Sequence, residues 1–490
     1  MAKFFSSEKH LHNARFALLH ELKNILSDKL DGTNLLLGES IFNHVLKAQP
    51  TETQKELANL LLVGRTRSGK GLHIESELLS WPHPAIVNDI KGELHQRTAG
   101  YREEELGGKV FVLDPTGKGH RYDPLEGKFK DSDLQSAATN LLYKHDEGEN
   151  KVFTDRAITM LTQIFHAARL EAKRLLPFTQ QMIYSGLPGA AFTLEEISQK
   201  HDFYPNLATR FLDVDILHAD FKDKFLLSCW GTFTSRMNRL LTKESVLCFT
   251  GSDFTAKALI TSDKPITVYL RWPEKDLLSL SPLVHLIWNS LMDGMIDTYD
   301  TLKGENCKRV LAVLDEIGRT GLPNLPEYAT TVCGRNISLL VPIQSLSQLD
   351  GVFGKYKADT LRAQMESQIF YRPADHETAE YLEKSLGYKS GFAHSKTDHE
   401  GGVSKGESEQ RIPLMTAQEI KLLGDDEIIG FRSGFRPFRA KRMDWRRFPI
   451  LAQRQRIPPP QLFSLPQLEE KLPDTAGLKT RASFIVAAYP

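Results

Sequence analysis

The chain has 490 residues, enough for about two to four domains with substantial cores. Lys plus Arg equals Asp plus Glu at 62 each, which excludes a whole-protein field that attracts polyanions, so any nucleic-acid partner must meet a local patch. The four cysteines occur singly, without C-x-x-C spacing, which argues against a disulfide framework and a structural zinc and favours a reducing cytoplasm. No apolar run approaches the about 18 residues that a membrane-spanning helix needs.

The first 56 residues predict a helix followed by a short strand or a hairpin. Apolar residues recur at helical spacing, including Phe16, Leu19, Leu22 and Ile25, and residues 35–38 form a short, largely apolar run. We expect no catalytic residue in this region. The start of the chain lacks a signal-peptide core, so we expect the chain as given to be soluble.

Residues 60–71 predict a phosphate-binding loop between a strand and a helix. The apolar run 60–63 suits a strand buried on both faces of a parallel sheet, and residues 72–80 have the composition of a helix. Backbone N–H groups of the loop can surround phosphate oxygens at the helix N-terminus, where the dipole also favours anions. Lys70 supplies a positive charge for the β and γ phosphates. The loop consists of Gly64, Arg65, Thr66, Arg67, Ser68, Gly69, Lys70 and Gly71.

The loop departs from the common G-x-x-x-x-G-K-[ST] pattern at its last position. Gly71 stands where a hydroxyl usually binds Mg²⁺. Three alternatives remain open at this point: Ser68 supplies the hydroxyl, Thr66 supplies it, or Mg²⁺ is held through water and a carboxylate elsewhere in the chain.

A second predicted strand, at residues 85–90, leads directly into charged residues. Polar side chains at the carboxyl end of a strand face the ligand crevice in open α/β sheets, so Asp89, Lys91 and Glu93 are candidates for the nucleotide site. A solvated turn before an ordinary helix explains them equally well. A third strand at residues 109–113 completes a strand and helix alternation that indicates an α/β fold.

Between residues 132 and 241 the apolar period changes to three and four, which predicts an all-α insertion. Arg236 and Arg239 lie there close to Trp230 and Phe233, a mixture that can bind a nucleic-acid backbone and stack on bases. A helical domain with a solvated basic face is the alternative interpretation.

The strand signal returns at residues 266–270 and again at 310–314, where it ends in two carboxylates. Asp315 can hold Mg²⁺ through water, and Glu316 can orient or deprotonate the attacking water. A strand that ends in Asp-Glu is weak evidence alone. It becomes strong when the same chain carries a phosphate-binding loop.

The next strand, residues 337–343, has a candidate at each end. Gln344 follows it and can sense the γ phosphate or position water. Arg335 precedes it, hence lies at the opposite edge of the sheet, and suits an arginine that reaches the nucleotide of a neighbouring subunit. An ordinary surface arginine is the alternative.

The C-terminal part contains a predicted loop, a basic patch and a tail. Residues 389–410 are rich in Gly, Ser, Lys, His and Glu and predict a flexible loop. Residues 430–456 combine nine Lys or Arg residues with one acid and several aromatic residues, and Arg436, Arg439 and Lys441 are candidate nucleic-acid contacts. Residues from about 458 onward predict a tail.

Together these motifs resemble the conjugative coupling ATPases of type IV secretion systems, the TraG-type family. The segments that carry the resemblance are 14–17, 66–71 (Thr-Arg-Ser-Gly-Lys-Gly), 89–93, 314–316, 343–349 and 436–441 (Arg-Pro-Phe-Arg-Ala-Lys). Gly-Lys-Gly is a familiar form of the loop in this family, which accounts for Gly71.

The resemblance implies an α/β fold in which a RecA-like P-loop NTPase domain with a parallel-rich sheet carries an inserted all-α domain. The expected organisation is an N-terminal region at 1–56, the motor domain at 57–125 and 264–455, the all-α domain at 126–263, and a tail at 456–490. It also implies ATP and Mg²⁺ as cofactors and a ring of six subunits. Family members usually begin with transmembrane helices, and this chain starts where those would end.

The implied function is ATP-driven delivery of DNA, a relaxase–DNA complex or secreted proteins to channel components at the cytoplasmic side of the bacterial inner membrane. Two other classes share some features. A DNA-pumping ATPase of the FtsK or HerA kind has the motor motifs without segments 89–93 and 436–441. A non-hydrolysing adaptor would explain Gly71, but it would be unlikely to retain Lys70, Asp315, Glu316 and Gln344 together.

Overall fold

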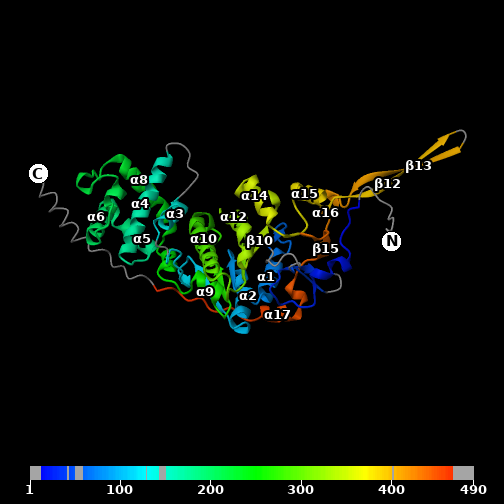
Figure 1. The fold of residues 1–490 in the computed structure, drawn as a ribbon, viewed down its shortest axis with the longest axis horizontal. Coiled ribbons are helices and arrows are strands. Elements are labelled where there is room, and N and C mark those ends of the chain that lie inside the picture. Colours follow the sequence, from blue (N-terminus) through cyan, green and yellow to red (C-terminus); the bar gives the residue numbers. More distant parts are fainter. Residues whose placement is uncertain are drawn as a thin grey trace. The chain divides into compact units, whose positions relative to one another are not determined.

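The computed structural model describes residues 13–40, 44–49, 59–127, 130–142, 150–399 and 402–466. These form two compact units, whose elements are labelled in Figure 1. Unit 1 draws its described residues from the stretches 1–88, 94–108 and 307–459, and unit 2 draws its own from 89–93, 109–306 and 460–490.

The centre of unit 1 is a parallel sheet with the strand order β11-β4-β10-β9-β5. Its strands are β4 (Leu60–Val63), β5 (Ala85–Asn88), β9 (Val310–Val313), β10 (Ile337–Ile343) and β11 (Ser367–Phe370). All residues of β4, β5, β9 and β10 are buried, which explains their continuous apolar runs. The predicted α/β fold is confirmed.

Antiparallel strands from both ends of the chain extend this sheet beyond β11 in the order β14-β15-β2-β3-β1. They are β14 (Glu427–Arg432), β15 (Phe438–Lys441), β2 (Leu36–Glu39), β3 (Val45–Lys47) and β1 (Leu26–Ser27), the last preceded by the 3₁₀ helix η1 (Leu19–Ile25). Gly430 is required because a Cβ there would come within 2.1 Å of the Phe438 ring. N-terminal and C-terminal strands therefore share one sheet.

Helices follow most of the parallel strands of unit 1. They are α1 (Lys70–Ser80), α2 (Glu93–Gly100), the π-helical turn η2 (Tyr101–Glu105), α11 (Ile317–Thr320), α12 (Leu325–Thr331), η5 (Cys333–Arg335), α13 (Leu346–Phe353), α14 (Lys355–Ala363), α15 (His376–Leu386), α16 (Ala417–Lys421), η6 (Trp445–Arg447) and α17 (Pro449–Gln455). Helix α1 buries most of its length, from His73 to Ser80.

The prediction of a flexible loop at residues 389–410 is wrong. The chain there forms an antiparallel ribbon of β12 (Tyr388–His399) and β13 (Gly402–Pro413), drawn in orange in Figure 1. Composition misled the prediction, because Gly, Ser and charged residues are depleted in strands in general. In this ribbon the cross-strand backbone pairing sets the register, from Tyr388 opposite Pro413 to His399 opposite Gly402.

Unit 2 contains a small sheet and a large helical region. Its parallel strands are β6 (Lys109–Asp114) and β8 (Ile266–Leu270), and β7 (Lys118–Gly119) is antiparallel to β6. The helices are α3 (Asp131–Leu142), α4 (Asn150–Leu170), α5 (Leu175–Tyr184), α6 (Gly186–Lys200), α7 (Leu207–Leu212), η3 (Ile216–His218), α8 (Lys224–Leu240), η4 (Ser245–Phe249), α9 (Ala256–Thr261) and α10 (Leu277–Leu302).

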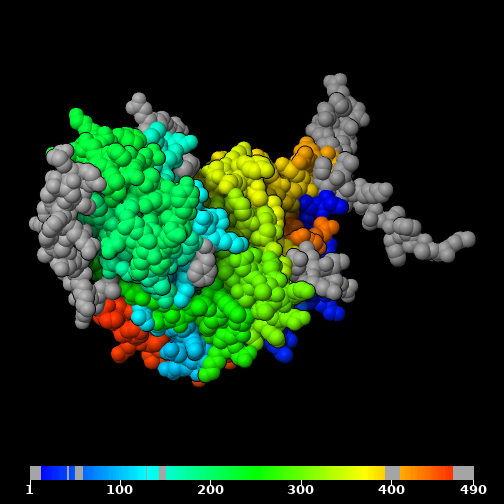
Figure 2. Space-filling view, turned by 60° about the vertical axis from the view of Figure 1, so that its left-hand side comes forward, coloured from blue at the N-terminus to red at the C-terminus, as the bar shows by residue number. Residues whose placement is uncertain are grey.

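The helices from α4 to α8 form the continuous green surface in Figure 2. In the described part of the interval from 131 to 261 there is no strand, as the all-α prediction expected. Strands β6 and β8 belong to the same compact unit as these helices, and the predicted domain boundaries stay a prediction. The predicted tail at 456–490 is described as far as residue 466, and its remainder lies outside the described residues. No helix among the described segments has both the length and the apolar character needed to cross a bilayer.

Arg454 of α17 holds three parts of unit 1 together. Its guanidinium donates to both carboxylate oxygens of Asp31, at 2.6 and 2.9 Å, and to the Leu79 carbonyl at the end of α1, at 2.9 Å. Its Nε donates to Glu105 at 3.1 Å, and the guanidinium lies 4.5 Å from the centre of the Tyr101 ring. Because the side chain is only 7% exposed, losing it leaves several acceptors without their donor.

We expect Arg454→Ala to lower the free energy of unfolding by about 2 to 3 kcal/mol, since charged hydrogen bonds in a largely buried setting are lost. The measurement is the shift in the urea midpoint. Arg456→Ala is the matched control, because Arg456 lies two residues away on the exposed surface. Equal midpoints for the two variants would contradict this role of Arg454.

Candidate functional site

The predicted phosphate-binding loop connects β4 to α1. Gly64 continues the register of the sheet, with its N–H donating to the Ile343 carbonyl at 3.1 Å. A Cβ at Gly64 would lie 2.7 Å from both Ser68 Oγ and Tyr371 Cβ, so only glycine fits there. Gly69 has φ +107°, a left-handed conformation that favours glycine, and helix α1 begins at Lys70. The strand, loop and helix are confirmed as predicted.

The side chain of Lys70 turns back over the loop. Its ammonium donates to the carbonyls of Gly64 and Arg65, the second at 3.1 Å. When a phosphate occupies the loop, the Lys70 ammonium at this position can donate to phosphate oxygens in place of these two carbonyl oxygens. This is the role that the sequence predicts for Lys70.

Position 71 lacks the hydroxyl of the common loop pattern, although the structure has space for a side chain there. A Cβ on Gly71 would meet no atom within 4 Å. Ser68 Oγ, in contrast, is buried and has no hydrogen-bond partner among the described residues. Since a buried hydroxyl normally has a partner, this group fits a phosphate oxygen or a metal-bound water. The observation favours Ser68 over the exposed Thr66 as the source of the hydroxyl.

The two carboxylates follow β9 at the same edge of the sheet as the loop. The Leu314 N–H donates to the Leu340 carbonyl of β10 at 2.9 Å, and the Asn88 amide donates to the Asp315 carbonyl at 2.6 Å. Glu316 has φ +55°, which is uncommon for a residue with a side chain. Such backbone strain concentrates at functional sites, and here it turns the chain sharply into α11.

Gln344 directly follows β10, the strand that lies between β4 and β9. Its backbone N–H donates a hydrogen bond to Gln348 Oε1 at 2.9 Å. The Gln348 side chain rests on Gly318 of α11, where a Cβ would come within 2.0 Å of it. The segment after β10 therefore packs against α11, the helix that follows Asp315 and Glu316.

Arg335 lies at the other end of β10, as the sequence predicted. It belongs to η5, is partly exposed, and donates to the Thr331 carbonyl at 3.1 Å. Asp89, Lys91 and Glu93 belong to unit 2, where the Asp89 N–H donates to the Leu270 carbonyl at 2.9 Å. The roles proposed for these four residues stay predictions.

Sequence reasoning missed four residues that line a cavity of about 270 Å³ beside the loop. These are Tyr371, Arg372, Asp425 and Arg442, and the other lining residues are Arg65, Arg67 and Ser68. Arg372 forms an ion pair with Asp425. Arg372 follows the last residues of β11, so the strand-end rule used for Asp315 had the information to find it. Nothing local marks Asp425 or Arg442.

Tyr371 links this cavity to the buried face of α1. Burial lowers the pKa of His73 to about 4, so its imidazole is neutral near pH 7. Its Nε2–H donates to the Leu36 carbonyl at 2.8 Å, which leaves Nδ1 to accept from the Tyr371 hydroxyl at 3.0 Å. Burial also raises the pKa of Glu77 to about 7. Helix α1 is thus connected to β2 and to the segment after β11.

Three of the five candidate nucleic-acid residues, Arg236, Arg436 and Arg439, have polar partners within the chain. On α8, Arg236 donates to the Leu142 carbonyl, while Arg239 is exposed. Near β15, Arg439 pairs with Glu427 at 2.8 Å, and Arg436 lies 3.9 Å from Glu21. Lys441 ends β15, opposite Glu39 in the register. Contacts with nucleic acid stay a prediction for all five basic residues.

Comparisons with known proteins agree with the fold and show the family. A family model described as type IV secretory system conjugative DNA transfer matches residues 19–466. The conjugal transfer protein TraG of Escherichia coli is 25% identical over 468 residues, which cover 86% of this chain and 71% of TraG. The protein VirD4 of Agrobacterium fabrum is 26% identical over 430 residues, which cover 80% of this chain and 59% of VirD4.

Solved structures with the same fold include the bacterial conjugative coupling protein TrwBdeltaN70 in complex with sulphate. Its TM-score is 0.60 at 16% identity, over 90% of this chain and 96% of that one. The plasmid coupling protein TrwB in complex with ADP and Mg²⁺ gives a TM-score of 0.61 at 17% identity, with the same coverage. Because the family model spans nearly the whole described chain, this protein belongs to the family of coupling proteins for conjugative DNA transfer through type IV secretion systems.

Proposed function

We propose that this chain is an ATP-hydrolysing motor that recruits a DNA or relaxase–DNA substrate, or a secreted protein, and delivers it to a type IV secretion channel. One observation carries the proposal. The phosphate loop after β4, Gln344 after β10 and the Asp315–Glu316 pair after β9 stand at the carboxyl ends of three adjacent parallel strands. This is the arrangement that phosphoryl transfer to water requires.

Each residue has a distinct task in the proposed mechanism. Backbone N–H groups of the loop and the Lys70 ammonium bind the β and γ phosphates of ATP. These donors stabilise the negative charge that develops on the phosphates in the transition state. Asp315 would hold Mg²⁺ through water, with Ser68 Oγ as a second oxygen. The ion would supply positive charge that offsets the negative charge of the phosphates.

Glu316 accepts a hydrogen bond from the attacking water and takes its proton. Gln344 contacts the γ phosphate, and its link through Gln348 to Gly318 carries the state of that phosphate to α11. We propose that the motor works as a homohexamer that docks on channel components at the cytoplasmic side of the bacterial inner membrane. TrwB, which shares the fold, has been solved with ADP and Mg²⁺ and with a non-hydrolysable ATP analogue.

Variants of Lys70 and Glu316 separate binding from turnover. We expect Lys70→Ala to weaken ATP binding, because the ammonium contacts the phosphates directly. Glu316→Gln keeps the shape of the side chain, so we expect it to bind ATP normally and to hydrolyse it about 100-fold or more slowly. Nucleotide titration and phosphate release measure the two effects.

The exposed Glu327, which pairs with Lys357 at 2.7 Å, provides the control Glu327→Gln. Wild-type hydrolysis by Glu316→Gln would remove Glu316 from the mechanism. Absence of hydrolysis in the wild type, under conditions where oligomers form, would favour the non-hydrolysing adaptor.

The position of Arg335 at the far end of β10 leads to a prediction about subunit boundaries. If Arg335 completes the site of a neighbouring subunit, then mixing Arg335→Ala protein with Lys70→Ala protein creates some interfaces with both residues intact. We expect partial recovery of ATP hydrolysis in such mixtures. No recovery in demonstrated mixed oligomers would make Arg335 a surface arginine.

DNA binding is tested by salt titration, since each neutralised phosphate releases counterions and steepens the salt dependence. We expect Arg236→Glu with Arg239→Glu, and Arg439→Glu with Lys441→Glu, to bind DNA more weakly and with slopes reduced by about one per lost contact. Lys355→Glu with Lys357→Glu on exposed α14 changes the charge equally and is the control. Identical slopes for all three variants and the wild type would exclude both patches and favour a protein cargo.

A further inference from the structure

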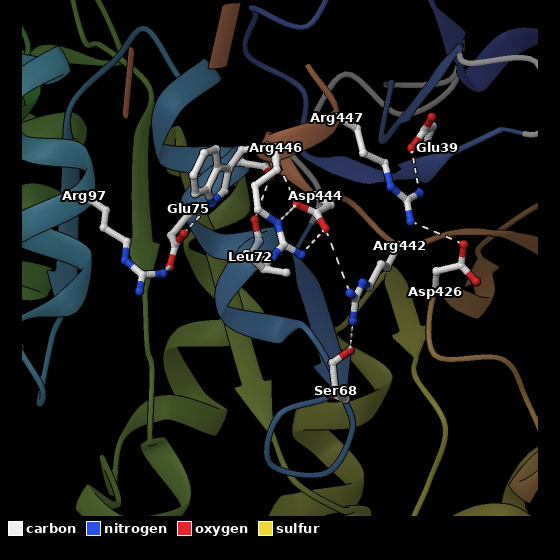
Figure 3. Close-up of polar contacts among 12 residues, drawn as sticks. Glu39, Ser68, Leu72, Glu75, Arg97, Asp426, Arg442, Asp444, Arg446 and Arg447 are labelled. Atoms are coloured by element: carbon white, nitrogen blue, oxygen red, sulfur yellow. Dashed lines mark hydrogen bonds and ion pairs between the residues drawn. The ribbon is translucent and has the colours of Figure 1, made fainter. Parts of the chain in front are cut away.

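We propose that Arg442 is a positioning residue that orients the phosphate-binding loop. Its guanidinium Nη1 donates to the backbone carbonyl of Ser68 at 3.0 Å, although the two residues are 374 positions apart (Figure 3). The proposal rests on the proposed nucleotide function of the loop and adds to it a residue from the C-terminal part of the chain.

The orientation of one peptide group makes this contact consequential. The peptide between Ser68 and Gly69 is trans, because Tyr204–Pro205 is the cis bond that the described chain contains. In a trans peptide the C=O and N–H bonds point in opposite directions. Since Arg442 holds the Ser68 carbonyl on its own side, the Gly69 N–H is directed to the other side of the peptide, where the loop can surround a phosphate.

The loop leaves room for Arg442 only because residue 69 is glycine. A Cβ at this position would lie 2.7 Å from Arg442 Nη1 and 2.8 Å from Cδ, in addition to opposing the positive φ. The guanidinium is therefore packed against the loop backbone. The Arg442 Nε is buried and has no hydrogen-bond partner among the described residues, which is unusual for a charged group. The contact of Nη1 with the Ser68 carbonyl is therefore made although Nε stays unsatisfied.

The segment that carries Arg442 is itself anchored (Figure 3). The Arg442 N–H donates to the Asp426 carbonyl at 2.7 Å, and Nη2 lies 3.9 Å from Asp444 Oδ2. Asp444 is nearly fully buried, and it accepts two hydrogen bonds from the Arg446 guanidinium, at 2.7 and 2.5 Å, and one from the Arg446 backbone N–H at 3.2 Å. The carboxylate therefore has a defined position from which it can orient the Arg442 guanidinium.

The neighbouring Trp445 ties the same segment to helix α1. Its indole N–H donates to Glu75 Oε2 at 2.5 Å, while Arg97 donates to Oε1 of the same carboxylate at 2.7 Å. Glu75 is buried and lies within the first two turns of α1. Segment 442–446 thus contacts both the loop, through Ser68, and the helix whose N-terminus faces the phosphates.

This geometry predicts a separation of KM from kcat. A correctly oriented Gly69 N–H binds the phosphate chain in both the ground state and the transition state, and loss of such uniform binding raises KM without lowering kcat. We expect Arg442→Ala to raise KM for ATP and the dissociation constant for MgADP by about tenfold, with kcat within about threefold of wild type. A purely structural role would reduce the active fraction, and hence kcat, and would leave KM unchanged.

Three further variants complete the experiment. Arg442→Lys retains one donor for the Ser68 carbonyl, so its constants should fall between those of Arg442→Ala and the wild type. Asp444→Asn should raise KM to a smaller extent, and it serves as the test together with Arg442→Lys if Arg442→Ala fails to fold. Arg447→Ala is the control, because Arg447 directly follows this segment but pairs with Glu39 and Asp426 instead of the loop.

Wild-type KM and MgADP affinity in Arg442→Ala, or in the two milder variants if that one is unfolded, would overturn the proposal. A loss of kcat at unchanged KM would also overturn it. Failure of the wild type to bind MgADP would instead count against the proposed nucleotide function itself, so the two failures are distinguishable.

Discussion

The parallel pairing of β10 with both β4 and β9 is the constraint on which the site depends. It places Val63 beside Ile343, and Leu340 beside Val313, so the segments that follow all three strands meet at one edge. A shift of β10 by two residues would move Gln344 by about 7 Å along the strand direction. Strands that are buried on both faces have no polar alternation to set their register, so another interaction must do it.

Asn59 supplies that interaction. It is 1% exposed and directly precedes β4, and its side-chain oxygen accepts a hydrogen bond from the Leu339 N–H of β10 at 2.9 Å. Its side-chain amide reaches the carbonyls of Ala329 and Gln364, and its own carbonyl accepts from Ser367 at the start of β11. One buried polar residue therefore aligns β4, β10 and β11 at their amino ends, and this alignment fixes the phosphate-binding loop relative to Gln344 at the carboxyl ends.

What the sequence predicted well were features encoded locally. An apolar run that ends in Gly, Asp-Glu or Gln marks both the strand and the edge, which is why the positions of Lys70, Glu316 and Gln344 in the fold were predicted correctly. Contacts between distant segments leave no such trace. Arg442 was part of a basic patch in the sequence, and only the fold places it against Ser68. The left-handed conformation of Glu316 was equally hidden, because no residue type there announces it.

Charge counting along the sequence also exaggerates the basic character of the C-terminal segment. Arg439 pairs with Glu427, Arg446 with Asp444, and Arg447 with Glu39 and Asp426. The exposed Arg439–Glu427 pair contributes little to stability. All of these pairs reduce the positive charge that the segment offers to a polyanion.

The shared sheet of N-terminal and C-terminal strands has a consequence for synthesis of the protein. Strands β1 to β3 lie within the first 47 residues, yet they join the rest of unit 1 through β15 at residues 438–441. Until the ribosome has released that distant strand, β2 has no partner on that side and exposes an unpaired backbone edge. A nascent chain cut short before β15 therefore carries a free strand edge, which is a template for aggregation.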